Sequence, residues 1–424
     1  MHVLYLHQYF GTRDGVGGTR SFEFARHLVA RGHTVTMVTA RRADSGLADV
    51  RRQHVAGIEV VTLGGRPYSN LLSTRQRLVE FARFTVRATL VRRCEPRPDI
   101  VIATSTPITI GIPGVLLARH YGVPLVFEVR DLWPRAPIEM GVLRNRLGIR
   151  AARWLERWIY RNARTVIALS PGMKDGVLST GVSPRRVVVI PNASDMDLFS
   201  PAVRDRTLLD RWGLRDAFVA VHAGSMGRIN GLDYLIDAAA ELARRGEDGI
   251  QLLILGDGGM RRALEDRVGA LHLRNVTFGG ALPRAAVAAI VSSSDAAITS
   301  VANVPVLATA SPNKFFDGLA AGIPALVNSP GWLRDLVTEH DAGAYVDVAH
   351  PGQLADALVR LRDDPELWAK QGRHARALAR ATFSRQQLAS RFTAVLEDAV
   401  GARSDLDRID DHQAPEGLLP IART

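Results

Sequence analysis

The sequence predicts an α/β protein with two doubly wound domains, each built on a parallel β-sheet, that face one another across a cleft. Three observations lead to this prediction. The chain of 424 residues is too long for one ordinary core. Short apolar runs rich in β-branched residues alternate with helical patterns over most of its length. The alternation is interrupted once, by a polar, proline-bearing stretch at 191–203, and then restarts.

Each apolar run has the length and composition of a strand, and the chain between runs suits crossover helices. In the first half the expected strands span 2–7, 34–39, 58–63, 99–104, 124–129, 165–170 and 186–191. In the second half they span 218–224, 251–256, 275–280, 295–300, 323–328 and 343–348. We therefore expect a first domain over 1–200, a second over 201–383, a final helix over 384–400 that can return to the first domain, and a mobile polar tail over 401–424.

Composition and charge restrict the kinds of partner and site that the protein can have. A net charge of +11 favours anionic partners, namely nucleic acid, phosphorylated small molecules or an acidic membrane face. Cys94 is the only cysteine, which rules out an internal disulfide and a cysteine-built metal cluster and favours a cytoplasmic setting. The start "MHVLYLHQYF" is typical of a first strand and not of a signal peptide, and no apolar run is long enough to span a membrane. Any membrane association is expected to be peripheral.

The stretch "SPNKFFDGLAAGIPALV" (311–327) predicts a short helix with Ser311 as its N-cap and Gly322 as its C-terminal stop. Lys314 in the first turn opposes the helix dipole unless an anion is present. A phosphate at this helix start would bind the free amides and Lys314 together. Asp317 lies on the same face and could accept hydrogen bonds from the sugar of a nucleotide. The alternative is a surface ion pair between Lys314 and Asp317.

Glycine-rich strand ends recur and should meet at one edge of the two sheets. "GVGGTR" contains Gly17 and Gly18, which allow close approach to a ligand. "HAGSMGRINGLDYL" contains Arg228, a candidate partner for a diphosphate. "ILGDGG" (254–259) and "FGGALP" (278–283) complete the set. Each stretch alone could be an ordinary turn, but four at one edge favour a ligand site.

The stretch "EVRDLWP" places charged residues at the carboxyl end of a first-domain strand, so we expect them at the cleft. They are Glu128, Arg130 and Asp131. An ion pair between Arg130 and Asp131 that braces the loop is the alternative. His7 and His222 also lie near strand ends, where each could bind a sugar or a phosphate or serve a structural role.

These stretches, in order over about residues 1–400, resemble the retaining glycosyltransferases of family four, which have two facing Rossmann-like domains (the GT-B fold). "EVRDLWP" with "PNKFFDGLAAGIP" resembles most closely the bacterial branch of O-antigen fucosaminyltransferases. The match also includes "RGHTVTMVT", "DIVIATSTP", "LERWIYRNARTVIALSPGM" and "VIPNASDMDLF". The sequence departs from the wider family at Ala310, where that family has a glutamate, and at Asn230, where it usually has a lysine.

The resemblance implies roles for individual residues. Asp317 matches the acid that binds the ribose, and Lys314 and Arg228 lie near the diphosphate. Asp131 matches the position beside the transferred sugar, with Arg130 supporting charge. The remaining implied contacts are those of Gly17 and Gly18 with the donor phosphates, of Gly256 and Gly279 with the region of the base, and of Glu128 and Asn313 with the sugar.

The implied activity is transfer of a hexose or N-acetylhexosamine from a nucleoside diphosphate sugar, with UDP favoured, to an acceptor in cell-surface polysaccharide synthesis. Fixed cations and helix starts would stabilise the leaving diphosphate. Acidic clusters with metal-ligand spacing are lacking in the sequence, so we expect neither a metal nor a cofactor besides the sugar nucleotide. An epimerase or phosphorylase of the same architecture is the first alternative. A nucleic-acid-binding protein is the second, although no helix-turn-helix, zinc-finger or RNA-recognition signature appears.

Two arginine-rich helical patterns favour a lipid-linked acceptor at an acidic membrane surface. Residues 73–93 carry six arginines against one acid, with Phe84 and Val91 on the arginine side. Residues 144–164 add more arginines with Trp154, Trp158 and Tyr160. Apolar residues among cations suit a membrane interface. Ordinary packing onto the first sheet, and a soluble acceptor, are the alternatives.

Overall fold

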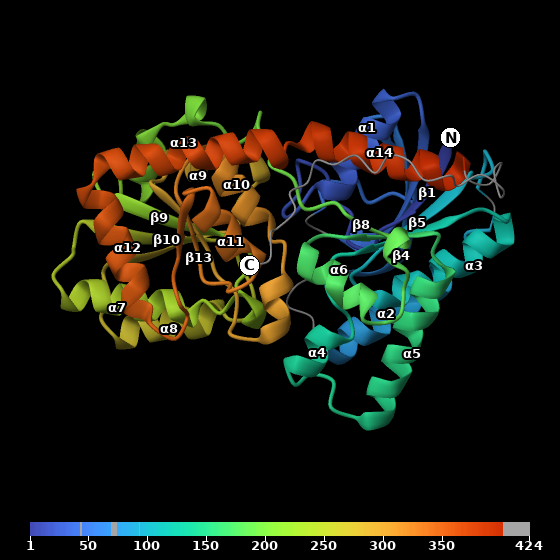
Figure 1. The fold of residues 1–424 in the computed structure, drawn as a ribbon, viewed down its shortest axis with the longest axis horizontal. Helices are drawn as coiled ribbons and strands as arrows, with labels where there is room; N and C mark the ends of the chain where they lie inside the picture. The colour runs from blue at the N-terminus through green and yellow to red at the C-terminus, as the bar shows by residue number, and fades with distance from the viewer. Residues whose placement is uncertain (43–44, 69–73, 93, 402–424) are drawn as a thin grey trace.

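The computed structural model describes residues 1–42, 45–68, 74–92 and 94–401. Two α/β domains lie side by side, each around its own sheet (Figure 1). The first sheet has eight strands in the order β3-β4-β2-β1-β5-β6-β7-β8, and the second has six in the order β11-β10-β9-β12-β13-β14. The predicted fold class is therefore confirmed. Apart from Gly401, which ends the last helix, the predicted tail over 401–424 lies outside the described residues.

All strands of the first sheet run parallel except β3, which pairs antiparallel with β4. The sequence did not predict β3, because "RQHV" is polar and lies at the sheet edge. A tight turn with positive φ at Ala56 and Gly57 joins it to β4. The strands are β1 (His2–Leu6), β2 (Thr34–Arg42), β3 (Arg52–Val55), β4 (Ile58–Tyr68), β5 (Ile100–Thr104), β6 (Leu125–Val129), β7 (Thr165–Ala168) and β8 (Val187–Val189).

Helices cover both faces of the first sheet, and alternate strand residues face the two layers. Leu4 and Leu6 face α2 (Thr74–Thr89), α3 (Gly111–Tyr121), α5 (Arg146–Asn162) and α6 (Pro171–Leu178). Tyr5 faces α1 (Arg20–Ala30) and α14 (Arg385–Gly401). The ring of Phe392 in α14 lies 6.2 Å from that of Tyr5. The last helix therefore crosses back from the second domain and packs on the first (Figure 1).

The second domain repeats the plan, and its strands are all parallel. They are β9 (Phe218–Ala223), β10 (Ile250–Leu255), β11 (Val276–Gly280), β12 (Ala296–Thr299), β13 (Ala325–Val327) and β14 (Gly343–Tyr345). The helices are α7 (Asp233–Arg244), α8 (Arg261–Ala270), α9 (Arg284–Ser293), α10 (Asn313–Ala321), α11 (Trp332–Glu339), α12 (Pro351–Asp363) and α13 (Pro365–Thr382). Parallel strands bring the loops after β9, β10 and β11 to one edge, facing the first domain.

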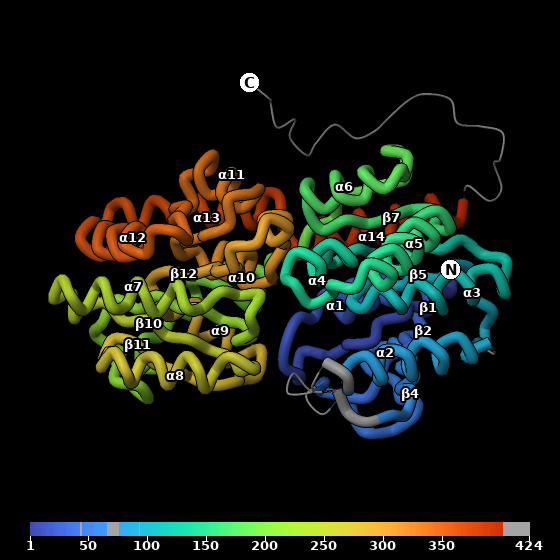
Figure 2. The backbone as a smooth tube through the Cα atoms, turned by 90° about the horizontal axis from the view of Figure 1, so that it is seen from below, coloured from blue at the N-terminus to red at the C-terminus, as the bar shows by residue number. Residues whose placement is uncertain are grey.

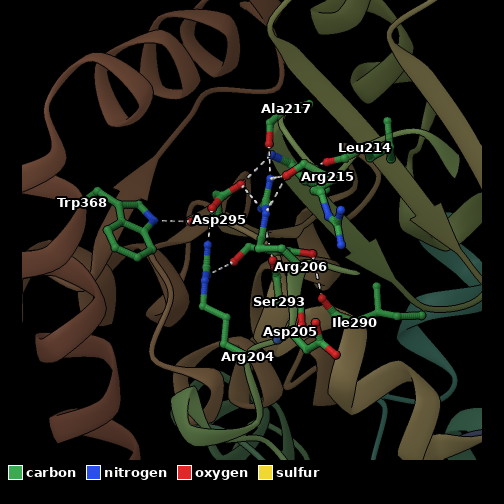
Figure 3. Close-up of polar contacts among 12 residues, drawn as sticks. Arg204, Asp205, Arg206, Leu214, Arg215, Ala217, Ile290, Ser293, Asp295 and Trp368 are labelled. Atoms are coloured by element: carbon green, nitrogen blue, oxygen red, sulfur yellow. Dashed lines mark hydrogen bonds and ion pairs between the residues drawn. The ribbon is translucent and has the colours of Figure 1, made fainter. Parts of the chain in front are cut away.

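A buried carboxylate anchors the segment between the domains. Asp295, just before β12, accepts hydrogen bonds from Arg204 at 2.6 Å and Arg206 at 2.7 Å (Figure 3). Its backbone carbonyl accepts another from the indole of Trp368 in α13 at 2.7 Å. The chain after residue 200 is therefore held against the second sheet.

Candidate active site

A cleft of about 560 Å³ lies between the two domains. The first domain contributes the glycine turn before α1 and Arg42 at the end of β2. The second domain contributes the turns after β9, β10 and β11 and the first turns of α9 and α10. The cleft thus lies where the carboxyl edges of the two sheets face each other, as expected for this architecture.

Lys314 in α10 lines the cleft without a carboxylate partner among the described residues. Its Nζ donates to Oδ1 of Asn230 at 2.7 Å and lies 3.3 Å from Nε2 of His222. Burial lowers the pKa of Lys314 to about 7 and holds the pKa of His222 well below its usual value. An anion bound here would restore the charge of Lys314, since opposite charge favours the protonated amine.

The start of α10 is open to the cleft. The helix begins at Asn313 with Pro312 as its N-cap, and no side chain of the cap residue bonds the first turn. The prediction of Ser311 as the cap is wrong, because its hydroxyl instead accepts a hydrogen bond from the backbone amide of Asn192. Gly322 ends the helix with φ +70°, as predicted. The amides at this helix start and Lys314 together form an anion site.

Asp317 does not pair with Lys314. Its two oxygens accept a bidentate contact from the guanidinium of Arg284, the first residue of α9, at 2.7 and 2.9 Å. Burial raises the pKa of Asp317, and Arg284 opposes that rise. The guanidinium also lies over the ring of Phe199, 4.7 Å from its centroid, while its Nε has no hydrogen-bond partner among the described residues. Asp317 and Arg284 both line the cleft, so a ligand there meets the pair as one unit.

The first domain approaches α10 through Gly17 and Gly18. Gly17 has φ +111°, which favours glycine. A Cβ on Gly18 would lie 2.5 Å from Nδ2 of Asn313 and 4.0 Å from the guanidinium of Arg130. The absence of a side chain at Gly18 therefore lets the two domains close at the helix start.

Arg130 and Asp131 follow β6 but form no ion pair with each other in the part of the chain that the structure describes. Arg130 donates to Nε2 of His7 at 3.2 Å. Burial and the positive charge of Arg130 keep the pKa of His7 well below its usual value, so the ring is neutral and can accept this bond. Thr106 donates to Asp131 at 2.6 Å, and burial raises the pKa of that carboxyl. The alternative of a bracing Arg130–Asp131 pair is therefore not what the structure has.

Glu128 lies beneath this loop and is completely buried. It pairs with Arg20 at 2.9 Å and accepts a hydrogen bond from Thr104 at 2.6 Å. Burial alone would raise the pKa of Glu128, but the charges of Arg20 and Arg130 and the hydrogen bonds from Thr104 and Arg20 together outweigh it, so the pKa is lowered. Arg20 also donates to the backbone carbonyls of Ile190 and Pro191 at the end of the first domain. The structure thus assigns Glu128 a supporting position inside the first domain, not one at the cleft surface.

The other predicted residues divide between the cleft and its surroundings. Gly256 lines the cleft with φ +126°, and a Cβ there would overlap the carbonyl oxygen of Gly224. Gly279 packs inward, where a Cβ would meet Leu255 at 2.4 Å. Arg228 is exposed and is not a lining residue, whereas Asn230, two residues later, reaches Lys314.

Sequence reasoning missed Arg284. A signal was present, because Arg284 is the first residue of a helix directly after the glycine-rich strand end "FGGALP", and Lys314 likewise lies in the first turn of α10. As for metals, within the described residues no three His, Cys, Asp or Glu side chains gather closely enough to hold an ion.

Each of the two domains matches a known protein family. The family described as "Glycosyl transferase 4-like domain" matches residues 17–193, and the family described as "Glycosyl transferases group 1" matches residues 217–364. Together the two matches cover well over half of the chain. The chain belongs to the glycosyltransferases. Both sides of the cleft fall within the matched regions.

Individual relatives are distant. Alpha-D-kanosaminyltransferase of Streptomyces kanamyceticus is 28% identical over 282 residues, which is 63% of this chain and 69% of the relative. A GDP-mannose-dependent alpha-mannosyltransferase of Mycobacterium tuberculosis is 25% identical over 278 residues, 64% of this chain and 66% of the relative. The chain therefore spans about two thirds of the length of these curated glycosyltransferases.

Solved structures share the fold over nearly the whole chain. Sucrose-phosphate synthase from Thermosynechococcus elongatus has a TM-score of 0.77 at 19% identity and covers 95% of this chain and 99% of its own. Anabaena HepE in complex with UDP and glucose has a TM-score of 0.70 at 20% identity and covers 94% of this chain and 100% of its own. This glycosyltransferase therefore has the two-domain GT-B architecture.

Proposed function

We propose that the protein is a retaining, metal-independent glycosyltransferase of the branch that resembles the O-antigen fucosaminyltransferases. It moves a hexose or N-acetylhexosamine from a nucleoside diphosphate sugar to an acceptor in cell-surface polysaccharide synthesis. UDP is the favoured nucleotide, since structural neighbours are solved with UDP and glucose and with UDP-2-fluoro glucose. No further cofactor takes part in this proposal.

One observation supports the donor site above all others. A half-buried lysine without a carboxylate partner among the described residues stands at a helix start that no cap side chain bonds, opposite a glycine turn from the other domain. An ammonium group partly removed from water in this way is unfavourable until an anion binds, and a diphosphate supplies that anion. Asp317, held by Arg284, then faces the nucleoside.

The chemistry follows from the charge that develops. The bond between the anomeric carbon and the diphosphate oxygen breaks, and its electron pair stays on the diphosphate. The acceptor oxygen forms the new bond and passes its proton to the departing diphosphate oxygen. Lys314 and the amides of α10 stabilise the leaving group more in the transition state than in the ground state. We assign Asp131 the place beside the transferred sugar and Arg130 the support of charge there.

The donor assignment is tested by calorimetric titration with UDP, GDP and ADP sugars, with and without EDTA. One nucleotide class should bind, EDTA should change nothing, and Lys314→Ala and Asp317→Ala should each abolish binding while the protein stays folded. Unchanged affinity in both variants, or a requirement for magnesium, would refute the site. The anomeric configuration of the product, read by NMR, tests retention.

We propose a lipid-linked acceptor used at the inner face of the cell membrane. The alternative is a soluble acceptor, which is favoured by the similarity to a protein named D-inositol 3-phosphate glycosyltransferase, 27% identical over 273 residues. Transfer of labelled sugar into an organic-solvent extract of membranes distinguishes the two, because a soluble product stays in the aqueous phase.

A further inference from the structure

The first domain carries an exposed basic layer on one face of its sheet. The layer consists of α2, α3 and α5 with the segment 140–145 that leads into α5. α3 contacts α2 on one side and α5 on the other, and the three helices lie together on the same side of the first sheet (Figures 1 and 2). Phe84 and Ala88 of α2 are buried beneath, so the predicted packing onto the sheet holds for this side of α2.

The outer side of the basic layer is unusually apolar. Fourteen large apolar side chains are exposed in the described part of the chain; seven of them belong to the layer and an eighth, Leu90, directly follows α2. The eight are Leu78, Val79, Val86, Leu90, Leu116, Val142, Leu147 and Trp154. Leu90, Leu147 and Trp154 are 68%, 74% and 64% exposed. Such a concentration of exposed apolar groups on one face indicates a contact surface.

Arginines stand among these apolar groups. α5 exposes Arg146, Arg150, Arg153, Arg157 and Arg161, and no carboxylate among the described residues forms an ion pair with any of them. The single acid of α5, Glu156, is only 8% exposed. Trp154 stacks on Trp158, with the ring planes 15° apart. The surface of α5 is therefore cationic, with an aromatic pair among the charges.

We propose that the basic layer docks peripherally on an anionic lipid bilayer. The guanidinium groups can reach lipid phosphates while the apolar side chains between them enter the membrane–water interface. Trp154 suits the boundary, because an indole is apolar but keeps one hydrogen-bond donor. The exposed apolar groups are spread over three helices and not gathered in one pocket, as a bilayer requires. Among the described residues, no helix is long and apolar enough to cross a membrane.

A short stretch of chain joins the basic layer to Asp131. Asp131 is followed within a few residues by α4 (Arg135–Glu139), which leads directly into the segment 140–145. Glu139 accepts a hydrogen bond at 2.7 Å from the backbone amide of Val306, which belongs to the second domain. Docking through the layer would thus hold the domain junction near the lipid surface. This part of the inference rests on the proposed lipid-linked acceptor.

The test is co-sedimentation of the full chain with vesicles of phosphatidylcholine alone or mixed with phosphatidylglycerol. We expect binding only to the anionic vesicles, weakened by salt. In one variant Arg150→Gln, Arg153→Gln and Arg157→Gln are combined. In the matched control, Arg215→Gln, Arg244→Gln and Arg262→Gln remove the same charge from exposed sites of the second domain. Losing three arginines from the layer should weaken binding about 100-fold, at about fivefold each. A third variant, Trp154→Ser with Leu147→Ser, should weaken it as well.

Four outcomes decide the matter. Loss of binding in the layer variant with retention in the control supports the proposal. Equal loss in both variants would assign the binding to net charge and overturn it. Failure of the wild-type protein to co-sediment with anionic vesicles would also overturn it. So would a dimer in sedimentation velocity that Trp154→Ser dissociates, since the face would then pair two copies. The melting temperature of each variant, compared with that of the wild type, shows whether the variant is folded. Vesicle binding needs no donor, so its failure is distinct from failure of the donor site.

Discussion

Donor binding should draw a proton onto Lys314. Burial lowers the pKa of this amine to about 7 in the free protein, while its ordinary value is 10.5. A bound diphosphate favours the ammonium form and raises the pKa again. At pH 8 about nine tenths of the free molecules hold a neutral Lys314, so binding should take up about 0.9 proton, against about 0.1 at pH 6.

The assay is isothermal titration calorimetry of the sugar nucleotide in buffers of different ionisation enthalpy. The slope of the observed enthalpy against the buffer enthalpy gives the number of protons taken up. A sugar diphosphate has no group that titrates in this range, and burial keeps His222, the neighbour of Lys314, neutral throughout. Above pH 7 the donor affinity should fall by up to tenfold per pH unit.

Lys314→Met is the control, because methionine has a similar length without the amine. Because methionine fills the space of the lysine stem, Lys314→Met should keep a weak donor binding that Lys314→Ala loses, and that binding should take up no proton. Absence of uptake at pH 8 in the wild type, or equal uptake in the variant, would refute the reasoning about this lysine. In the free protein the same pKa makes the free energy of unfolding rise from pH 7 to 10.5, since the unfolded chain binds more protons in that window.

Three further substitutions test the neighbouring geometry. Arg284→Met leaves Asp317 buried and unpaired, so urea denaturation should show a loss of roughly 3–5 kcal/mol; a change under 1 kcal/mol would contradict the pairing. Gly18→Ala should displace Asn313 and weaken donor affinity by about 1 kcal/mol, or fivefold, in the same calorimetric titration; an unchanged affinity would mean that the domains need not close there. Asp131→Asn should lower kcat about 100-fold while donor affinity stays constant; full activity would exclude Asp131 from the chemistry.

Much of the architecture could be predicted before any coordinates. Thirteen strands were expected from apolar runs, and the structure has a strand at each of those places. The strand that was not predicted, β3, lies at the edge of the sheet, where side chains are partly exposed and can be polar. The helix start at Asn313 was predicted to within two residues, but its cap was not, because Ser311 could bond either its own helix or Asn192.

The site was predicted less completely. Lys314, Asp317, Gly17, Gly18 and Gly256 line one cleft, as expected from their positions at strand ends and helix starts. Glu128 and Arg228 sit at equally suitable positions in the sequence, yet Glu128 is buried under the loop, and Arg228 is exposed and does not line the cleft. The direction in which a loop side chain points depends on what packs around it, and local sequence does not encode this.

The sequence by itself determined the two sheets, the edge at which their loops meet and the cationic character of the cleft. The spacing of apolar residues, the glycine turns and the helix starts that predict these features are local properties of the chain. Only the tertiary structure decided which residues contact Lys314 and Asp317. Lys314 meets residues 84 and 92 positions away, and Asp317 meets an arginine 33 positions away. Such contacts arise from how whole helices pack together, and a short-range pattern carries no record of that packing.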